Sequence, residues 1–97
     1  MFYVYVLKSE KDGKLYIGQT SDLRRRIKEH NSGQTRSTKS RIPFQLIYYE
    51  AYLDFRDVKI REAKLKQFKN SYTELKKRIS HSLSNLKVAE GEIPHHF

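Results

Sequence analysis

A run of six apolar residues at positions 2–7, FYVYVL, restricts the fold more than any other part of the sequence. The β-branched, aromatic and leucine side chains that fill it are typical of a strand buried on both faces. We therefore expect a strand at residues 2–8 in the centre of a sheet. The pair Asp12-Gly13 favours a tight turn, so residues 14–18, KLYIG, are predicted to return as the second strand of a hairpin.

Helix start signals organise the rest of the chain. Thr20, Ser21 and Asp22 form one helix start, with a carboxylate near the positive end of the helix dipole. Asp54 is predicted to cap the next helix, with Asp57 at its third position. Ser71 followed by Glu74 predicts a further capping box. The elements expected after the hairpin are a helix at residues 22–31, a strand at 44–52, and helices at 55–69 and 72–86. The order β-β-α-β-α-α predicts an α/β protein of the α+β type, with a small three-stranded, mixed or antiparallel sheet flanked by helices.

One domain accounts for this sequence, because 97 residues leave no room for two cores of ordinary size. We assign residues 1–86 to the domain and expect residues 87–97 to form a loose tail. No stretch has the length and apolar character of a signal peptide or a membrane span. The absence of cysteine excludes disulfides and zinc–thiolate sites and allows a reducing compartment, so we expect a cytoplasmic protein.

Basic residues strongly outnumber acidic ones. Twenty Lys and Arg against eleven Asp and Glu give a formal net charge of +9. Such an excess favours a polyanionic partner, either nucleic acid or an acidic membrane surface. A basic protein with nothing bound is the alternative, and for a chain this short we weigh nucleic acid ahead of it.

Two polar residues of the first predicted helix lie on its apolar side. Leu23 and Ile27 define the buried stripe at 100° per residue, and Arg26 and His30 fall on or beside it. The neighbouring charged residues that point into solvent are Arg24, Arg25, Lys28 and Glu29. The arginine could reach past the core to water and the histidine could be an ordinary core residue. Together they favour a phosphate site, because guanidinium binds phosphate in a fork and imidazole can transfer a proton.

The second predicted helix carries a carboxylate on its apolar side. Phe55, Val58 and Leu65 form the stripe, and Glu62 lies beside it. Burial of an unpaired carboxylate is costly. One interpretation is an ion pair with an arginine, Arg26 or Arg61. The other is a metal ligand, since Mg²⁺ commonly binds one or two protein carboxylates together with substrate phosphate and water.

The order and spacing of these residues resemble the GIY-YIG nuclease family, and most closely its small stand-alone bacterial members. The matching pieces are Tyr3-Val4-Tyr5, Tyr16-Ile17-Gly18, Arg26 ten residues after Tyr16, His30 four residues later, and Ile60-Arg61-Glu62. The resemblance covers residues 2–80. Tyr3 stands where the family name has its first glycine. Asn70 is the nearest candidate for the family's late asparagine, although its spacing from Glu62 is short.

The resemblance implies a metal-dependent endonuclease with one Mg²⁺ or Mn²⁺ ion at Glu62. It implies that Tyr16 activates or positions the attacking water with help from His30. Tyr5 would hydrogen-bond around the nucleophile, and Arg26 would stabilise the charge that grows on the phosphate. The substrate would be DNA more readily than RNA. The alternative functions are a nucleic-acid-binding module that does not cut, and a structural protein associated with a ribosome or another partner.

Binding to nucleic acid is expected to come from basic residues that face solvent. These are Arg24, Arg25 and Lys28 on the first helix and Arg36, Lys39 and Arg41 in residues 32–43. That second segment lacks acidic residues and periodicity, and we expect a mobile loop. If the two helices pack on the same sheet, their apolar stripes should converge, so that Arg26 and Glu62 meet near Tyr5 and Tyr16.

Overall fold

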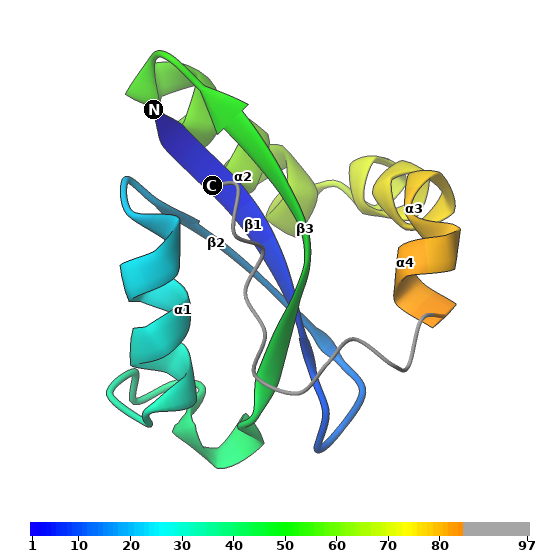
Figure 1. Ribbon diagram of the computed structural model, residues 1–97. Helices are drawn as coiled ribbons and strands as arrows, with labels where there is room; N and C mark the ends of the chain where they lie inside the picture. The colour runs from blue at the N-terminus through cyan, green and yellow to red at the C-terminus, as the bar shows by residue number, and fades with distance from the viewer. Residues whose placement is uncertain (85–97) are drawn as a thin grey trace.

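The computed structural model describes residues 1–84, and a three-stranded sheet forms its centre (Figure 1). The strands are β1 (Phe2–Ser9), β2 (Leu15–Thr20) and β3 (Phe44–Tyr52). Their order is β2-β1-β3, and both pairs are antiparallel. The sequence-based prediction of the sheet is therefore confirmed, including the central place of the FYVYVL strand.

Helices cover the sheet and extend beyond it. They are α1 (Leu23–Asn31), α2 (Phe55–Gln67), α3 (Lys69–Arg78) and the short α4 (Ser80–Ser84), with a 3₁₀ turn, η1, at Lys39–Arg41. The predicted helix start at residues 20–22 and the predicted cap at Asp54 are confirmed, and Asp22 is the residue that caps α1. The Asp22 side chain accepts a hydrogen bond from the backbone N–H of Arg25, and that of Asp54 accepts one from Arg56.

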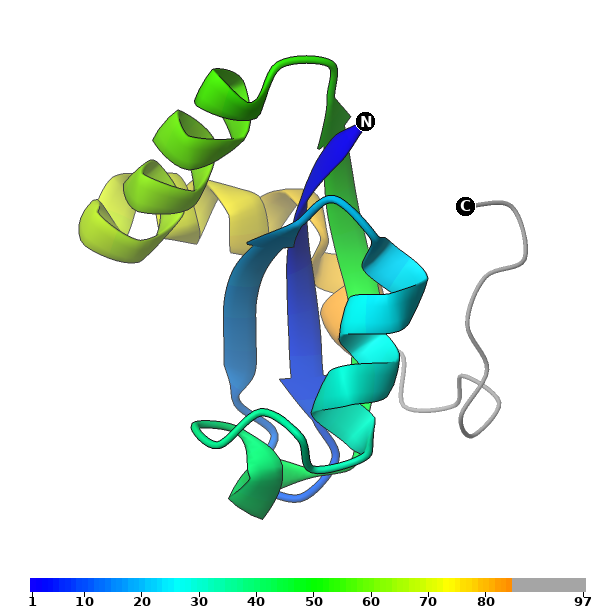
Figure 2. The same ribbon diagram turned by 90° about the vertical axis from the view of Figure 1, so that its left-hand side faces the viewer.

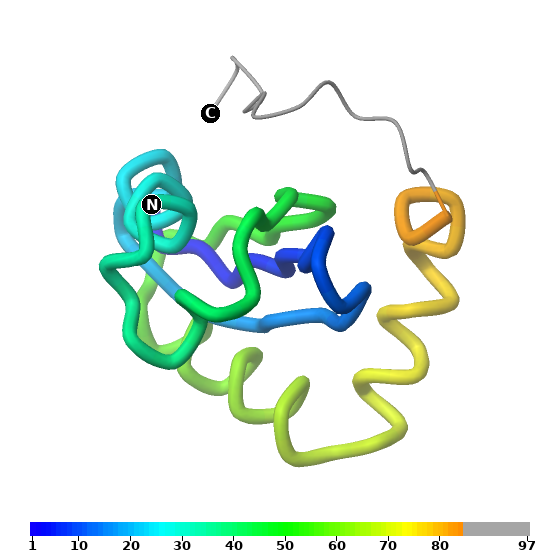
Figure 3. The backbone as a smooth tube through the Cα atoms, turned by 90° about the horizontal axis from the view of Figure 1, so that it is seen from below, coloured from blue at the N-terminus to red at the C-terminus, as the bar shows by residue number. Residues whose placement is uncertain are grey.

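The helices α1 and α2 lie on opposite faces of the sheet, with α3 and α4 beside it (Figure 3). Leu23 and Ile27 of α1 pack with Tyr5 and Leu7 in one core. The other core, which contains α2, is formed by the buried residues Val4, Val6, Ile17, Val58, Leu65, Leu75 and Ile79. Both helices therefore pack on the same sheet, and their apolar stripes contact it from opposite faces. The connection through α1 occupies one face between the parallel strands β2 and β3, which leaves the other face for α2.

Phe55 also departs from the predicted stripe of the second helix. Its side chain is 39% exposed and contacts the Phe2 ring, with the ring centroids 5.5 Å apart. Val58 and Leu65 are buried as predicted. The first turn of α2 therefore lies at the end of the sheet, and the packed part of the helix begins at Val58.

The third predicted helix, residues 72–86, is two helices within the described part of the chain. α3 begins directly after Phe68, which supplies no side-chain cap, so the predicted capping box of Ser71 and Glu74 lies inside the helix. The break falls at Ile79, whose side chain is buried in the core. This bend keeps Ile79 and the following Leu83 against the sheet. The predicted end of the helix and the tail at 87–97 lie outside the described residues.

The segment 32–43, expected to be a mobile loop, is anchored at several points. Thr38 is fully buried, and Arg41 forms an ion pair with Asp12, with its Nε 2.7 Å from Oδ2. The side-chain amide of Asn31 bonds both backbone groups of Phe44, at 3.0 and 2.6 Å. These contacts hold the loop against α1 and the hairpin. Among residues 1–84, no helix combines the length and apolar character that crossing a bilayer requires.

Candidate active site

Tyr5 and Gly18 form the base of the site. They are partners in the register of β1 and β2. A Cβ atom at position 18 would lie 2.5 Å from Cζ of the Tyr5 ring, so the ring occupies the space above the glycine. Because β2 is an edge strand (Figure 2), the buried Tyr5 ring extends from the central strand over the edge strand. The glycine is needed there for close approach, at an ordinary strand position.

A buried chain of hydrogen bonds fixes Tyr5. Its hydroxyl lies 2.9 Å from His30 Nε2, and His30 Nδ1 lies 2.8 Å from Thr38 Oγ1. The Thr38 hydroxyl donates to the Thr35 carbonyl at 3.4 Å. Thr38 must then accept from Nδ1–H, which leaves Nε2 to accept from the Tyr5 hydroxyl; this tautomer is assigned from the network.

The protonation states of His30 and Tyr5 agree with a hydrogen bond donated by the tyrosine to the histidine. Burial and the nearby charge of Arg26 lower the pKa of His30 to about 4. Burial raises the pKa of Tyr5 to about 12, although the Arg26 guanidinium opposes part of the increase. At neutral pH the histidine is therefore neutral and the tyrosine is protonated. His30 holds Tyr5 in place, and its buried ring is not available to take a proton from a water molecule in solvent.

Arg26 lies beside this network and is 31% exposed. Its Nη1 donates to Glu29 Oε1 at 3.1 Å and to Thr35 Oγ1 at 3.3 Å. Glu29 was expected to point into solvent, and that was wrong, because it is half-buried and positions Arg26. The guanidinium interacts electrostatically with Tyr5 and Tyr16. The guanidinium is partly exposed to solvent, where its N–H groups can donate to an external anion.

Tyr16 belongs to the same aromatic cluster and is partly exposed. Its ring meets that of His30 edge to face, with the centroids 5.0 Å apart, and lies 6.4 Å from those of Tyr5 and Phe44. The partner of His30 Nε2 is the hydroxyl of Tyr5 and not that of Tyr16. Tyr16 therefore lies at the boundary between the buried network and solvent, on the edge strand.

Glu62 approaches the same edge from the other face. Its side chain is 23% exposed, and Lys66 Nζ lies 3.3 Å from Oε2. Its carboxylate also acts on the Tyr5 hydroxyl, where it contributes to the raised pKa after the larger effect of burial. Arg26 and Glu62 thus come together near Tyr5 as expected, but around the edge of the sheet and from opposite faces.

Glu62 does not form the ion pair with Arg26 or Arg61 that was one interpretation of its position. Arg61 instead binds Glu50 through two nitrogens, with Nε 2.9 Å from Oε1 and Nη2 2.9 Å from Oε2. Arg26 pairs with Glu29. The Lys66 pair links adjacent turns at the surface, and such pairs contribute roughly 0–1 kcal/mol. The carboxylate of Glu62 is therefore free to exchange its partner.

The donor set at Glu62 fits a hard cation held mostly by its substrate. Among residues 1–84, no group of three or more His, Asp or Glu side chains comes together. A metal at this edge would have Glu62 as its protein ligand, and phosphate oxygens and water as the others. Mg²⁺ and Mn²⁺ accept such a set, because they bind oxygen and Mg²⁺ retains water readily.

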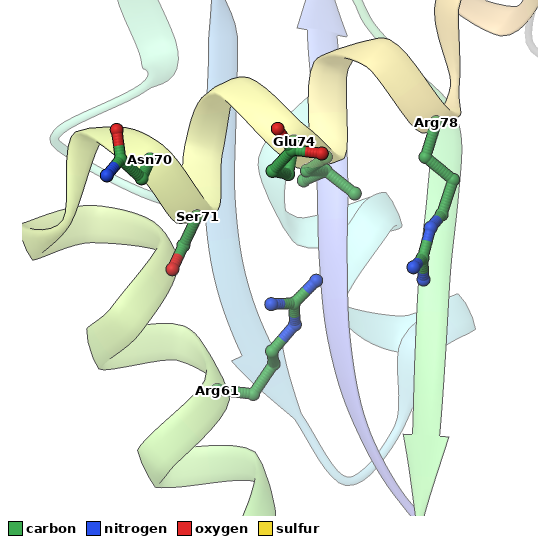
Figure 4. Close-up of a pocket in the computed structure, with 6 residues that line it drawn as sticks. Arg61, Asn70, Ser71, Glu74 and Arg78 are labelled. Carbon is green, nitrogen blue, oxygen red and sulfur yellow. The ribbon is translucent and has the colours of Figure 1, made fainter.

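Asn70 lies at a different place. It lines a pocket of about 290 Å³ between α2 and α3, together with Arg61, Ser71, Glu74, Leu75 and Arg78. Figure 4 shows its side chain at the start of α3, directed away from Arg61. None of the residues that surround Tyr5 lines this pocket. The structure does not bring Asn70 together with the tyrosines.

The six basic residues expected to bind nucleic acid differ in their surroundings. Arg24, Arg25, Lys28, Arg36 and Lys39 are exposed. Arg41 is only 24% exposed, because it pairs with Asp12 and its guanidinium lies 5.4 Å from the centroid of the Phe44 ring. Its contacts are those of a structural residue that fixes the loop.

Four residues hold the site together in ways that the sequence analysis did not predict, namely Gly18, Glu29, Thr35 and Thr38. Gly18 was named only as part of the family resemblance, and Glu29 was expected to face solvent. A buried histidine needs partners on both ring nitrogens, and this rule could have directed attention to hydroxyls in the following loop. It could not have selected Thr38 among several serines and threonines.

Comparisons of the sequence and the fold with known proteins find one matching family and several similar proteins. Residues 1–81 match the sequence model of the family described as the GIY-YIG catalytic domain. A UPF0213 protein of Pediococcus pentosaceus is 41% identical over 88 residues, which cover 89% of this chain and 92% of the relative. A UPF0213 protein of Streptococcus pneumoniae serotype 4 is 41% identical over 73 residues, or 74% of this chain and 73% of the relative. The solution NMR structure of a UPF0213 protein from Bacillus halodurans is 32% identical with a TM-score of 0.51, and 91% of this chain and 99% of that chain are covered.

Proposed function

This chain belongs to the GIY-YIG nuclease family, and we propose that it is a metal-dependent endonuclease that hydrolyses phosphodiester bonds at the β2 edge of the sheet. The substrate class that the family implies is nucleic acid. Within that class we propose DNA as the substrate in preference to RNA. We propose that the protein acts in DNA repair or recombination and that it is located in the cytoplasm.

One observation carries the proposal. The Tyr5 hydroxyl experiences a guanidinium from one face of the sheet, Arg26, and a carboxylate from the other, Glu62. A phosphodiester that lay along the edge between these charges would contact both. The surroundings match what phosphoryl chemistry needs, which is a fixed cation for the phosphate and a ligand for a metal on the same substrate.

The proposed roles follow from exposure and hydrogen bonding. Tyr16, which reaches solvent, positions the attacking water, and Arg26 stabilises negative charge on the phosphate. The neutral pair of Tyr5 and His30 holds the tyrosine hydroxyl at the edge. Glu62 would hold the metal, which when bound neutralises charge on the phosphate and the leaving oxygen. His30 is thus a positioning residue in this proposal.

A non-cleaving nucleic-acid-binding module is the second candidate. The exposed arginines and lysines of α1 and the following loop support binding under either function. The grouping of Arg26 and Glu62 around Tyr5, with Tyr16 beside them, supports cleavage over binding alone. Binding should weaken steeply with salt under both functions, because phosphate contacts release counterions.

A cleavage screen tests the proposal. Labelled DNA and RNA as blunt duplex, nicked duplex, flap, junction and single strand would be incubated with Mg²⁺, Mn²⁺ or a chelator. The expected result is cleavage of at least one substrate that requires the metal and is absent in Glu62→Ala. Salt-sensitive binding without cleavage of any substrate would favour the non-cleaving module.

A further inference from the structure

Two neighbouring hollows lie along the outside of β2, and the first of them adjoins Tyr16. The first, of about 300 Å³, is lined by Tyr16, Ile17, Leu65 and Lys66. The second, of about 480 Å³, is lined by Lys8, Lys14, Lys76 and Leu83. Leu15 and Tyr72 line both, so the two hollows lie next to each other. We call the pair of hollows, from Tyr16 to Leu83, the edge groove.

The edge groove is basic along its length. Lys66 lies at the end beside Tyr16, and three further lysines surround the other end. No Asp or Glu lines either hollow in the described part of the chain. Lys8 is fixed, because its Nζ donates to the Leu83 carbonyl at 2.9 Å. Lys14 is exposed and has no salt bridge within residues 1–84.

The edge groove also has an apolar wall. Leu15, Tyr72 and Leu83 are only partly buried, and they border the main core on the α2 side of the sheet. The ammonium of Lys76 lies 4.6 Å from the centroid of the Tyr72 ring. An aromatic and aliphatic surface among lysines is the combination that binds an unpaired strand, because bases stack on the rings and phosphates contact the cations. A duplex hides its bases and would leave this wall without a partner.

We propose that the edge groove binds an unpaired nucleic-acid strand that continues from the phosphodiester at Tyr16. The inference rests on the proposed nuclease function, because the edge groove begins at the residue proposed to position the water. It narrows the substrate class to nucleic acid with a single-stranded segment next to the cleaved bond. Lys14 and Lys76 contact the phosphates of that segment, and Leu15 and Tyr72 contact its bases.

Binding without metal tests the edge groove separately from cleavage. The affinity for a labelled blunt duplex would be compared with that for the same duplex carrying an unpaired overhang, by fluorescence anisotropy in a chelator. We expect the chain to prefer the overhang substrate by about tenfold, as suits one stacked base and one or two phosphate contacts. The variant Lys14→Glu/Lys76→Glu should lose this preference and keep most of its affinity for the blunt duplex.

The matched control is Lys59→Glu/Lys64→Glu, which reverses two exposed charges of α2 that do not line the edge groove. It should weaken both substrates alike and keep the preference. No preference in the unmodified chain, or an equal loss on both substrates in the groove variant, would overturn the inference. If metal-dependent cleavage is observed in that case, the nuclease function stands and only the groove fails. If the preference is present without cleavage, the groove stands and the nuclease function fails.

Discussion

Two arginines approach the sheet from opposite faces, and the protein neutralises them to different degrees. Arg61 binds both carboxylate oxygens of Glu50, which is only 14% exposed and also accepts hydrogen bonds from the hydroxyls of Tyr48 and Tyr52. Arg26 binds Glu29 of its own helix through one nitrogen. The charge of Arg61 is therefore neutralised by a carboxylate of the strand β3, whereas that of Arg26 is neutralised by a residue one turn away on its own helix.

We propose that this difference separates a structural charge, Arg61, from a functional one, Arg26. A carboxylate held by three partners cannot leave without exposing a partly buried cation, so the Glu50–Arg61 pair joins α2 to β3. A pair between residues three apart on a helix surface contributes little to stability. Arg26 is available to a phosphate for that reason. The predictions below test this contrast, from the largest effect to the smallest.

Arg26→Ala should abolish most cleavage without loss of the fold. We expect the single-turnover rate to fall by roughly 10²–10³-fold, as when one preorganised donor to a developing negative charge is removed. The thermal midpoint should stay near that of the unmodified chain. Single-turnover kinetics together with thermal unfolding measure both, and a rate within threefold of the original would break the contrast.

Arg61→Met should show the opposite behaviour. Removal of one partner from this half-buried pair should lower the free energy of unfolding by roughly 3 kcal/mol, because Glu50 loses its counterion. The cleavage rate of the folded molecules should remain close to the original. The control is Arg56→Met on the same helix, whose arginine pairs with Asp54 at the surface. Urea unfolding should show no comparable loss for that variant.

The buried histidine should make stability depend on pH. Its pKa is about 4 in the folded protein, below the ordinary value of 6.5, because burial disfavours the charged ring. Between these values the unfolded chain binds more protons, so the contribution of His30 is complete above about pH 6.5 and is lost as pH falls towards 4. The expected loss by pH 4 is about 3 kcal/mol.

The variants His30→Gln and His81→Gln isolate that contribution. His81 is exposed on α4 and serves as the matched control. Urea unfolding at several pH values should show that the pH-dependent part between 4 and 6.5 disappears in His30→Gln and persists in His81→Gln. Identical pH profiles for the two variants would mean that His30 is not held neutral.

Arg24→Ala/Arg25→Ala should have the smallest effect, and on binding alone. Both side chains are exposed on α1. Loss of two phosphate contacts should weaken nucleic-acid binding by several-fold and reduce the slope of log affinity against log salt by about 2. Titrations at several salt concentrations measure the slope. An unchanged slope would show that these arginines do not contact phosphate.

Local signals in the sequence predicted the strands and the starts of two helices, and they predicted which side of α1 is buried. The strand FYVYVL, the turn at Asp12-Gly13 and the caps Asp22 and Asp54 are decided by residues within a few positions of each other, and all lie where expected. The position of His30 follows from helical periodicity alone. These features were predictable because neighbouring residues determine them.

Features decided by contacts between distant segments were not predictable. Thr38 meets His30 because the loop folds back, and Glu50 meets Arg61 because β3 lies under α2. The break at Ile79 depends on where the end of the sheet allows apolar side chains to pack. The placement of α1 and α2 on opposite faces depends on the whole topology, and it changed how Arg26 and Glu62 come together.

Glu62→Gln tests the central claim, that the β2 edge is a metal-dependent catalytic site, most directly. The substitution keeps the size of the side chain and removes the charge that a metal requires. Within residues 1–84 the carboxylate is paired only with Lys66, at the surface. The variant should therefore unfold at the same temperature and bind nucleic acid as before, yet show no cleavage with Mg²⁺ or Mn²⁺. Unfolding of the domain, or cleavage at the original rate, would contradict the assignment of Glu62 as the metal ligand.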